Sequence, residues 1–444
     1  MFKEEIERGE SEILEFKREL PSKDKKLMKT VVAFANCRGG RIVFGVDDRT
    51  HEVLGVDETD RARLQDLVAD MISDTCTPQI FPTFSWQSVN DKSVFIVDIP
   101  KSRQTPYYLK AEGMEKGVYV RVGATTRTAS MEKVRELQLH GQNITYDAVV
   151  ETGIEAITRQ NAEAVCAAIQ EYMGDTATPL GTKQLVSWGL LHRSSGGLYP
   201  TNAYRLLEGD SVHFSGIQCA VFQGTEKVDF LDRKVFSGPV YEQLENAQRF
   251  LMQYLRCPAI IESTRRQDVY EIPVKALRES IVNAILHRNY LVHAFIQVSV
   301  FDDRVEILSP GGLYGNLSKE EMLSGLSRLR NPLLAGIFHR MNIAEQWGTG
   351  ILRIINTCTQ AGLPTPEFVV TGDSVKLIIT RPQMKPTATK EKTRKRRPHK
   401  RDEALLAYLR ENPGAPLQQA ADAFFISAAT VWRFVQDMRN EGKL

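Results

Sequence analysis

One tract near residue 390 limits how this chain can fold, because it cannot join a packed core. The sequence from Arg381 to Arg401 contains three prolines, a dense run of lysines and arginines, and no hydrophobic periodicity. A segment of this composition buries too little apolar surface to offset the entropy lost on ordering, so it predicts a disordered linker at 383–401. The tract therefore separates a long N-terminal part from a short C-terminal part.

The length of the chain indicates several domains. It has 444 residues, whereas a single domain usually spans roughly 100 to 200. We expect a multidomain α/β (α+β) protein with an all-α C-terminal domain. The domain boundaries that we predict from breaks in the apolar pattern are 1–145, 146–258, 259–382, the linker 383–401, and 402–444.

Composition and charge exclude several classes of protein. There are 57 Lys and Arg against 55 Asp and Glu, so any affinity for nucleic acid must come from local patches. The six cysteines form no CxxC pair, which disfavours a disulfide framework or a structural zinc site. The charged N-terminal sequence and the lack of an apolar run of about 18 residues lead us to expect a cytoplasmic protein without membrane association.

The first 145 residues show the pattern of one α/β domain. Apolar residues fall at helical spacing from Leu27 to Ala35, and the glycines after Arg38 end that helix before a buried strand at 42–46. A helix at 61–73 and strands at 93–99 and 118–122 follow. The sequence therefore predicts a compact unit that ends near residue 145.

Carboxylates near the start of this unit are candidates for a metal site. Alternating apolar and polar residues place Glu15 and Lys17 on one face of a short strand. Glu10 would reach the same side only if the chain bends between it and the strand, and a third acid follows the strand at 42–46, as Asp47 or Asp48. Three carboxylates would form a hard-oxygen site for Mg²⁺ or Mn²⁺, with Lys17 at a phosphate. From spacing alone, solvated surface acids are the more common explanation.

The segments ESEILEFKREL and VVAFANCRGGRIVFGVDDRTHEVLGV resemble the Schlafen AlbA-like family almost step by step. The resemblance implies that Glu10, Glu15 and Asp48 are the metal-binding catalytic acids, with Lys17 beside them, of an endoribonuclease that acts on transfer or ribosomal RNA. Asp48 is preferred over Asp47 because the residue just after Gly-Val varies in the family. Many bacterial members are described as DNA-binding or transcriptional regulators, so a binding role without cleavage stays open.

Basic and aromatic residues later in this domain suggest contacts with nucleic acid. Lysines and arginines would contact phosphates, and tyrosines would stack on unpaired bases. An equally common explanation is a solvated loop beside a core strand. The candidates that we predict here are Lys101, Arg103, Tyr107, Arg121 and Arg127.

The region 146–258 shows a helix at 160–172 and a strand at 217–222, without residues that suggest chemistry.

The next region begins with Glu279 and Asn283, which lie four residues apart and therefore on one face of a helix. Strands follow at 296–301 and 304–308, then a Gly-rich flexible stretch to Leu326. A strand at 375–379 closes the domain.

This order resembles the GHKL ATPase superfamily over residues 272–380. The resemblance implies an α/β sandwich in which Asn283 holds Mg²⁺, Glu279 orients the attacking water, and two glycine pairs cradle the phosphates of ATP. The glycines are Gly311 and Gly312 after one strand, and Gly348 and Gly350 at the start of a helix. Ser309 and Pro310 stand where hydrolysing members carry an adenine-binding Asp, so a degenerate domain kept for dimerisation is the alternative, and we expect a homo-oligomer.

The last segment has the size of a helix-turn-helix. A first helix contains Leu405 to Leu409, a second spans 417–424, and Ser427 would cap a third over 428–440. Docking in the major groove would expose Thr430, Arg433 and Gln436, while Val431, Phe434 and Val435 would face inward. A two-stranded wing would be minimal here. The alternative for such a three-helix unit is a protein-docking module.

Two functional hypotheses follow from these patterns. The first is a metal-dependent endoribonuclease acting on structured RNA such as transfer RNA, in phage defence or stress. The second is an ATP-responsive transcriptional regulator that binds DNA without cleaving it. The three acids favour the enzyme and the terminal helix-turn-helix favours the regulator, and the sequence gives the enzyme the greater weight.

Overall fold

The computed structural model describes most of the chain as two compact units, residues 1–382 and 383–444. The described residues are 2–20, 25–102, 104–153, 155–174, 179–194, 196–209, 215–257, 259–262, 265–268, 270–345, 348–382, 400–412, 417–424, 426, 431, 434–435 and 438. The predicted linker therefore lies, apart from its last two residues, outside the described part of the chain.

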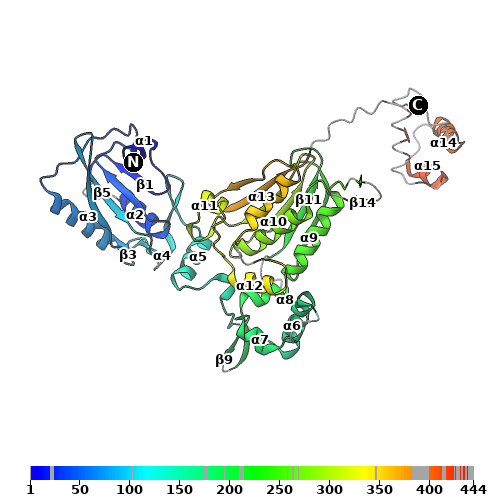
Figure 1. Ribbon diagram of the computed structural model, residues 1–444, viewed down its shortest axis with the longest axis horizontal. Helices are drawn as coiled ribbons and strands as arrows, with labels where there is room; N and C mark the ends of the chain where they lie inside the picture. Colours follow the sequence, from blue (N-terminus) through cyan, green and yellow to red (C-terminus); the bar gives the residue numbers. More distant parts are fainter. Residues whose placement is uncertain are drawn as a thin grey trace. The chain divides into compact units, whose positions relative to one another are not determined.

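The N-terminal domain is built on a mixed sheet in the order β1-β2-β5-β4, within the described residues (Figure 1). Strands β1 and β2 run parallel because α2 crosses between them, and the other neighbours are antiparallel. The strands of this domain are β1 (Leu14–Lys17), β2 (Gly40–Phe44), β3 (Cys76–Thr77), β4 (Thr83–Val89), β5 (Lys92–Ile99), β6 (Tyr108–Leu109), β7 (Tyr119–Val122) and β8 (Thr125–Thr128). The helices are α1 (Phe2–Arg8), α2 (Lys25–Asn36), α3 (Arg61–Thr75), α4 (Gly113–Lys116) and α5 (Met131–Gly141).

Helix α2 organises this domain. Its apolar face packs on β2 and β5, and it ends where Gly39 adopts a φ of +80° and donates its N–H to the carbonyl of Phe34. The side chain of Asn36 then bonds the backbone of Tyr107 and of Tyr119, at 2.7 to 3.0 Å. One buried amide thus ties the segment just before β6 and strand β7 to the helix, as buried polar groups require partners.

A second hydrophobic core extends from residue 162 to residue 379. It includes α6 (Arg159–Met173), α7 (Thr182–Ser187) and α8 (Asn202–Glu208), which accompany the 3-10 turn η1 (Tyr146–Ala148) and the hairpin of β9 (Leu191–Ser194) and β10 (Gly197–Pro200). The predicted boundary at residue 258 therefore does not separate two cores. The predicted boundary is wrong because the region 146–258 packs against the domain that follows and shares its core.

The larger sheet has the order β12-β11-β15-β16-β18-β17, again within the described residues. Its strands are β11 (Ile217–Phe222), β12 (Phe230–Phe236), β15 (Ile296–Val300), β16 (Arg304–Pro310), β17 (Glu367–Val370) and β18 (Ser374–Thr380). Strands β11 and β12 come from the region that we predicted to be a separate connecting domain. Strand β11 joins the sheet because it pairs in parallel with β15.

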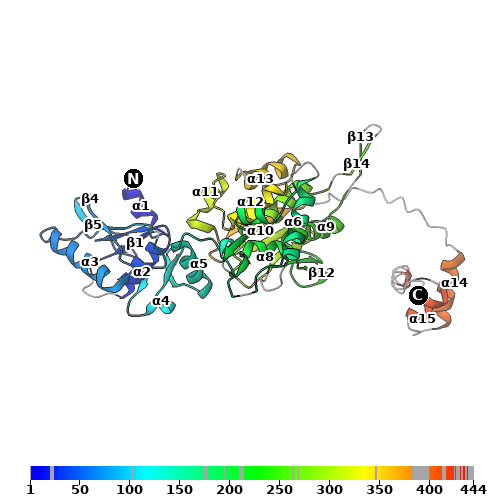
Figure 2. The same cartoon turned by 90° about the horizontal axis from the view of Figure 1, so that it is seen from below.

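Three helices cover one face of this sheet: α9 (Val240–Tyr254), α10 (Val274–His287) and α13 (Gly350–Gln360). Figure 1 shows α10 between the other two. The segment between β16 and α12 (Pro332–Arg340) was predicted to be flexible, but it holds the turn η2 (Tyr314–Asn316) and helix α11 (Lys319–Leu323). A hairpin of β13 (Ala259–Glu262) and β14 (Arg265–Asp268) extends away from the sheet after α9 (Figure 2).

The C-terminal unit contains α14 (Lys400–Glu411) and α15 (Leu417–Phe424). Its core holds Leu405, Ala420, Ala421 and Val431, with Phe434 and Val435 packed against it. The prediction that Val431, Phe434 and Val435 face inward is confirmed. The predicted DNA-reading residues Thr430, Arg433 and Gln436 lie outside the described residues.

Among the helices described, none is long and apolar enough to span a bilayer.

Candidate functional site

The turn before β1 brings Glu10 back to that strand. Gly9 has a φ of +85°, and a Cβ at that position would lie 2.6 Å from the imidazole of His51, so only glycine fits. The carboxylate of Glu10 accepts a hydrogen bond from the N–H of Phe16 at 3.0 Å. The bend on which the placement of Glu10 depended is therefore present.

Glu15 is held by two cations. Its carboxylate lies 2.7 Å from the Nζ of Lys17 and 2.9 Å from Nη1 of Arg121, and only 6% of its surface is exposed. Lys17 thus shares a face of β1 with Glu15, as predicted. Arg121 also donates to the carbonyl of Ser11 at 2.8 Å, which ties the turn to β7.

Glu10 and Glu15 lie close enough to influence each other. Burial raises the pKa of Glu10, the hydrogen bond from Phe16 opposes that rise, and the negative charge of Glu15 adds to it. Two neighbouring carboxylates with a lysine beside them remain consistent with phosphodiester chemistry. Both oxygens of Glu15 are nevertheless already occupied by cations of the protein.

The third predicted acid, Asp48, has a different environment from Glu10 and Glu15. Asp48 is exposed in the turn that follows β2. Its neighbour Asp47 is bound locally, because its carboxylate accepts the N–H groups of Thr50 and Arg49, which lower its pKa, and pairs with Arg18 at 3.1 Å. Within the described residues, no group of three or more acids, histidines or cysteines is arranged to hold a metal ion. The described geometry therefore does not fit a Mg²⁺ or Mn²⁺ ion held by Glu10, Glu15 and Asp48.

The candidates for nucleic-acid contact in this domain have different environments. Lys101 and Arg127 are exposed, whereas Arg103 lies outside the described residues. Tyr107 is only 2% exposed because Asn36 binds its backbone and its hydroxyl meets Ser102, so its ring is not available to stack on a base. Arg121 is 5% exposed and forms an ion pair with Glu15, so its guanidinium is not available to a phosphate.

A shallow groove of about 320 Å³ lies where β2 begins, next to the end of β5. It is lined by Ile13, Arg38, Gly39, Gly40, Arg41, Thr83, Asp98, Ile99, Pro100 and Lys101. We refer to it as the basic groove. The sequence predicted Lys101 here but missed Arg38 and Arg41, although the run Arg-Gly-Gly-Arg at 38–41 is a visible signal of backbone flanked by cations.

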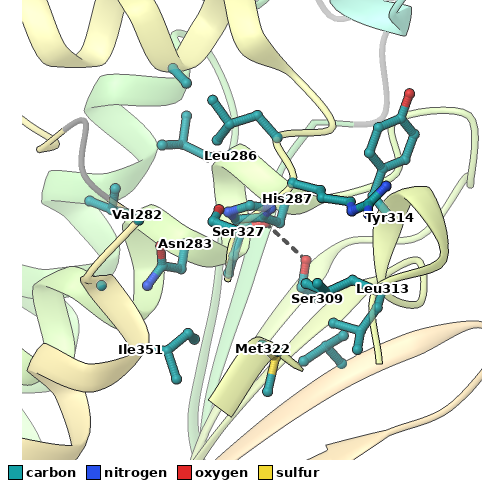
Figure 3. Close-up of a pocket in the computed structure, with 18 of the residues that line it drawn as sticks. Val282, Asn283, Leu286, His287, Ser309, Leu313, Tyr314, Met322, Ser327 and Ile351 are labelled. Atoms are coloured by element: carbon teal, nitrogen blue, oxygen red, sulfur yellow. Dashed lines mark hydrogen bonds between the residues drawn. The ribbon is translucent and has the colours of Figure 1, made fainter. Parts of the chain in front are cut away.

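The domain with the larger sheet contains a cavity of about 690 Å³. Its lining includes every residue that we predicted to bind a nucleotide, namely Glu279, Asn283, Gly311, Gly312, Gly348 and Gly350. Figure 3 shows Val282, Asn283 and Leu286 of α10 facing Leu313, Met322 and Ile351 across this space. A pocket of this size with apolar walls and a few polar groups is typical of small-molecule sites.

One end of the cavity is polar and tightly packed. Gly350 begins α13 against α10, where a Cβ would lie 2.4 Å from the carboxylate of Glu279 and 2.9 Å from the amide nitrogen of Asn283. Burial raises the pKa of Glu279, and Arg353, 3.5 Å away, opposes the rise. The amide nitrogen of Asn283 is buried beside the carboxylate of Glu279 and also opposes the rise in that pKa, but it makes no hydrogen bond of good geometry. A ligand oxygen that accepts from it would recover up to about 1–3 kcal/mol.

The other end is closed by glycines and a serine. Gly311 has a φ of +97°, and a Cβ on Gly312 would meet the carbonyl of Gly372 at 2.5 Å, so both positions require glycine. The hydroxyl of Ser309 donates to the carbonyl of Ala284 at 2.9 Å, the bond drawn in Figure 3.

These features fit a nucleotide in part. The amino end of α13, marked by Gly348 and Gly350, lines the cavity and offers a positive helix end to phosphates. Of the described lining residues, Arg328 is the one that carries a full positive charge, since burial lowers the pKa of His287 to about 4. Asn283 would hold a Mg²⁺ ion that accompanies the phosphates and supplies charge neutralisation.

Three family models match parts of the chain. Residues 10–130 match the model described as "Schlafen, AlbA_2". Residues 293–379 match HATPase_c_4, described as "Putative ATP-dependent DNA helicase recG C-terminal". Residues 399–444 match the model described as "Winged helix-turn-helix DNA-binding". The second match begins after α10, so Glu279 and Asn283 lie outside it.

Two solved structures resemble the chain. The DIP2311 protein of Corynebacterium diphtheriae is 20% identical, with a TM-score of 0.45, over 96% of this chain and 88% of that one. The N-terminal domain of a "Putative ATP-dependent DNA Helicase RecG-related Protein" from Nitrosomonas europaea is 26% identical, with a TM-score of 0.23, over 29% of this chain and 90% of that one. No curated protein matches the chain.

The three matched segments have the order that the motifs predicted, and the last of them matches a model described as DNA-binding. The chain therefore joins a Schlafen AlbA_2 domain, an ATPase-like domain of the recG C-terminal family and a winged helix-turn-helix, and it is a nucleic-acid-binding protein.

Proposed function

We propose that the protein is a DNA-binding transcriptional regulator whose cavity between α10 and α13 takes a purine nucleotide. The observation that carries this proposal is the cavity itself. Its lining gathers six residues from three separate motifs, and it leaves the amide nitrogen of Asn283 without a hydrogen bond of good geometry. A bound phosphate oxygen would provide such a bond.

The helix-turn-helix supports the DNA-binding part of the proposal. Its helices are held by a small apolar core in which Val431, Phe434 and Val435 face inward. Side chains that alternate with these on a helix point outward, which favours Thr430, Arg433 and Gln436 for contact with base edges.

Selection from a pool of random duplexes tests this part. The full chain should enrich a defined motif, and Arg433→Ala should weaken binding of that motif by about 5- to 100-fold. The matched control is Arg410→Ala on α14, which should retain the motif. Enrichment of no motif by the wild type would contradict the regulator.

Equilibrium binding of ATP with Mg²⁺ tests the cavity. The wild type should bind, and Asn283→Ala should weaken binding by roughly 10-fold because an oxygen ligand of the ion is lost. The control is Asn246→Ala, whose side chain lies on α9 and bonds Arg249. Equal, negligible signals for the wild type and Asn283→Ala would remove ATP from the account.

A second candidate function is a metal-dependent endoribonuclease acting on structured RNA such as transfer RNA, in phage defence or stress. One observation favours it: the turn at Gly9 returns Glu10 to β1, where its pKa responds to Glu15. The Schlafen AlbA_2 match is compatible with this chemistry. Cleavage would need Asp48 or another oxygen donor to approach when substrate binds.

The nuclease is tested with total RNA and duplex DNA, each with and without Mn²⁺ or Mg²⁺. Metal-dependent cleavage that is lost in Glu10→Ala and Asp48→Ala, but kept in the exposed hairpin control Glu52→Ala, would establish the enzyme. Cleavage that is absent, or equal in all four proteins, would remove it.

A further inference from the structure

The basic groove carries three cations around a glycine turn. Arg38 and Arg41 flank Gly39 and Gly40, and Lys101 follows the end of β5. A Cβ on Gly39 would lie 2.7 Å from the carbonyl of Ile99, so the backbone of the turn passes directly over that strand end. The groove therefore combines close backbone with long basic side chains, which is the chemistry that phosphate groups select.

Two acids of the N-terminal domain act on Arg41. Glu5 pairs with Arg41 at 2.7 Å. Asp98 also lines the groove, and burial raises its pKa, an effect that the charge of Arg41 opposes. Glu5 and Asp98 thus lie near Arg41, whereas the acidic partner of Arg38 belongs to another segment.

Arg38 and Lys101 both contact the segment that walls the nucleotide cavity. Nη2 of Arg38 lies 2.7 Å from a carboxylate oxygen of Glu321 on α11, and Nζ of Lys101 lies 3.4 Å from the carbonyl oxygen of Gly315 in η2. Both partners are oxygen acceptors, as the oxygens of a phosphodiester would be. The ion pair is partly exposed, with 28% and 41% of the two side chains accessible, so an incoming phosphate can compete for it.

Glu321 is fixed in place by its own helix. Its carboxylate accepts the N–H of Ser318 at 2.7 Å, while Ser318 caps the helix through the N–H of Glu321. That hydrogen bond lowers the pKa of Glu321, and the charge of Arg38 adds to the effect, so the carboxylate is ionised at neutral pH. The next residue, Met322, lines the cavity.

We propose that the basic groove is a binding site for the phosphate backbone of nucleic acid, with Arg38 and Lys101 as its phosphate contacts, and that Glu321 occupies Arg38 in competition with the phosphate. This inference rests on the proposed nucleic-acid-binding function and names a site and a control for it. Because α11 carries both Glu321 and the cavity-lining Met322, a ligand that shifts α11 also changes the access of phosphates to Arg38.

The test measures equilibrium binding of the full chain to two labelled oligonucleotides, a short duplex DNA and a single-stranded RNA, over a range of salt concentrations. Arg38→Ala and Lys101→Ala should each weaken binding about 3- to 10-fold and reduce the slope of log affinity against log salt by about one. The duplex and the RNA distinguish the source of the phosphates. The control Arg63→Ala removes a cation from an exposed surface pair on α3 and should change neither value.

The competition is tested by Glu321→Gln, which removes the charge and keeps the shape. Binding should tighten about 2- to 5-fold, as the loss of a partly exposed ion pair predicts. The same substitution combined with Arg38→Ala should show no gain over Arg38→Ala alone, because the two residues act through one contact. Glu367→Gln on β17, an exposed position, changes the net charge equally and should have no effect.

The outcomes separate this inference from the proposed function. Wild-type binding to neither oligonucleotide would overturn the nucleic-acid-binding function and the groove together. Wild-type binding that is unchanged in Arg38→Ala and Lys101→Ala would overturn the groove alone. Equal gains for Glu321→Gln and Glu367→Gln would overturn the competition.

Discussion

The polar groups of the N-terminal site and those of the nucleotide cavity differ in how many of their hydrogen bonds and ion pairs the protein itself supplies. Glu15 has a cation at each oxygen, and Glu10 accepts a backbone N–H. At the cavity, Glu279 pairs with Arg353 at 3.5 Å, and the amide nitrogen of Asn283 beside that carboxylate makes no hydrogen bond of good geometry. Polar groups whose hydrogen bonds and ion pairs are all made stabilise the fold. A buried polar group that lacks a hydrogen bond beside open volume gains most from a bound ligand, because the ligand supplies the missing bond.

The largest effect that we predict tests the N-terminal site. Arg121→Ala removes the buried cation of the pair and leaves Glu15 with Lys17 alone, and breaking a buried pair in this way costs about 3–5 kcal/mol of unfolding free energy. Denaturant unfolding measures this loss. Adding Glu15→Gln should recover part of it, because the buried carboxylate that has lost Arg121 no longer carries a charge.

The control for this prediction is Arg127→Ala on β8, an exposed arginine of the same hairpin. Its effect should remain within about 0.5 kcal/mol. An Arg121→Ala loss no larger than that of the control would mean that Glu15 is not stabilised by Arg121.

A pH effect at the cavity comes next in size. The folded pKa of His287 is lowered to about 4 by burial, followed by the charge of Arg330, so the unfolded chain binds a proton that the folded chain does not over pH 4 to 6.5. The contribution of the uncharged, buried His287 to the unfolding free energy is therefore fully present above about pH 6.5. It is lost as the pH falls, by about 2 kcal/mol at pH 4.5.

Unfolding free energies at a series of pH values, for the wild type and His287→Gln, measure this contribution. The difference between the two curves should change across pH 4.5 to 7. Parallel curves would show that His287 titrates normally in the folded protein.

A smaller effect tests the close approach of α13 to α10. Gly350→Ala forces the carboxylate of Glu279 to move, which should cost about 1 kcal/mol and weaken ATP binding. The control is Gly336→Ala on α12, which also lines the cavity but whose Cβ would meet nothing within 4 Å. Alanine there should be neutral or stabilising, since it reduces the entropy of the unfolded chain.

An effect of the same size concerns the turn at Gly9. Gly9→Ala places a Cβ against His51 at a φ of +85°, so we expect a loss of about 1 kcal/mol in unfolding free energy. Gly153→Ala, where a Cβ meets nothing within 4 Å, is the comparison. Equal stability of the two variants would contradict the tight turn that positions Glu10.

Local patterns in the sequence predicted much of the fold. The helix at 160–172 and the strand at 217–222 correspond closely to α6 and β11. Strand β12 was not predicted, because most of its residues are exposed at the edge of the sheet and show no alternation. The hydrophobic pattern marks a strand only where one face is buried.

In the N-terminal domain, side-chain contacts were predictable only where one segment supplies both partners. The pairing of Glu15 with Lys17 follows from the alternation of a single strand. The partner of Glu15 on the other side, Arg121, lies 106 residues away, and no local pattern predicts it. The burial of Tyr107 likewise depends on Asn36, 71 residues earlier, which is why a Lys-rich and Tyr-rich loop suggested an exposed ring.

The measurement that tests the central claim most directly is the affinity of the full chain for its selected duplex with and without ATP and Mg²⁺, in the wild type and in Asn283→Ala. The regulator predicts that ATP changes the wild-type affinity by about 5-fold or more and leaves that of Asn283→Ala unchanged. A wild-type affinity that ATP does not alter would contradict nucleotide control of DNA binding.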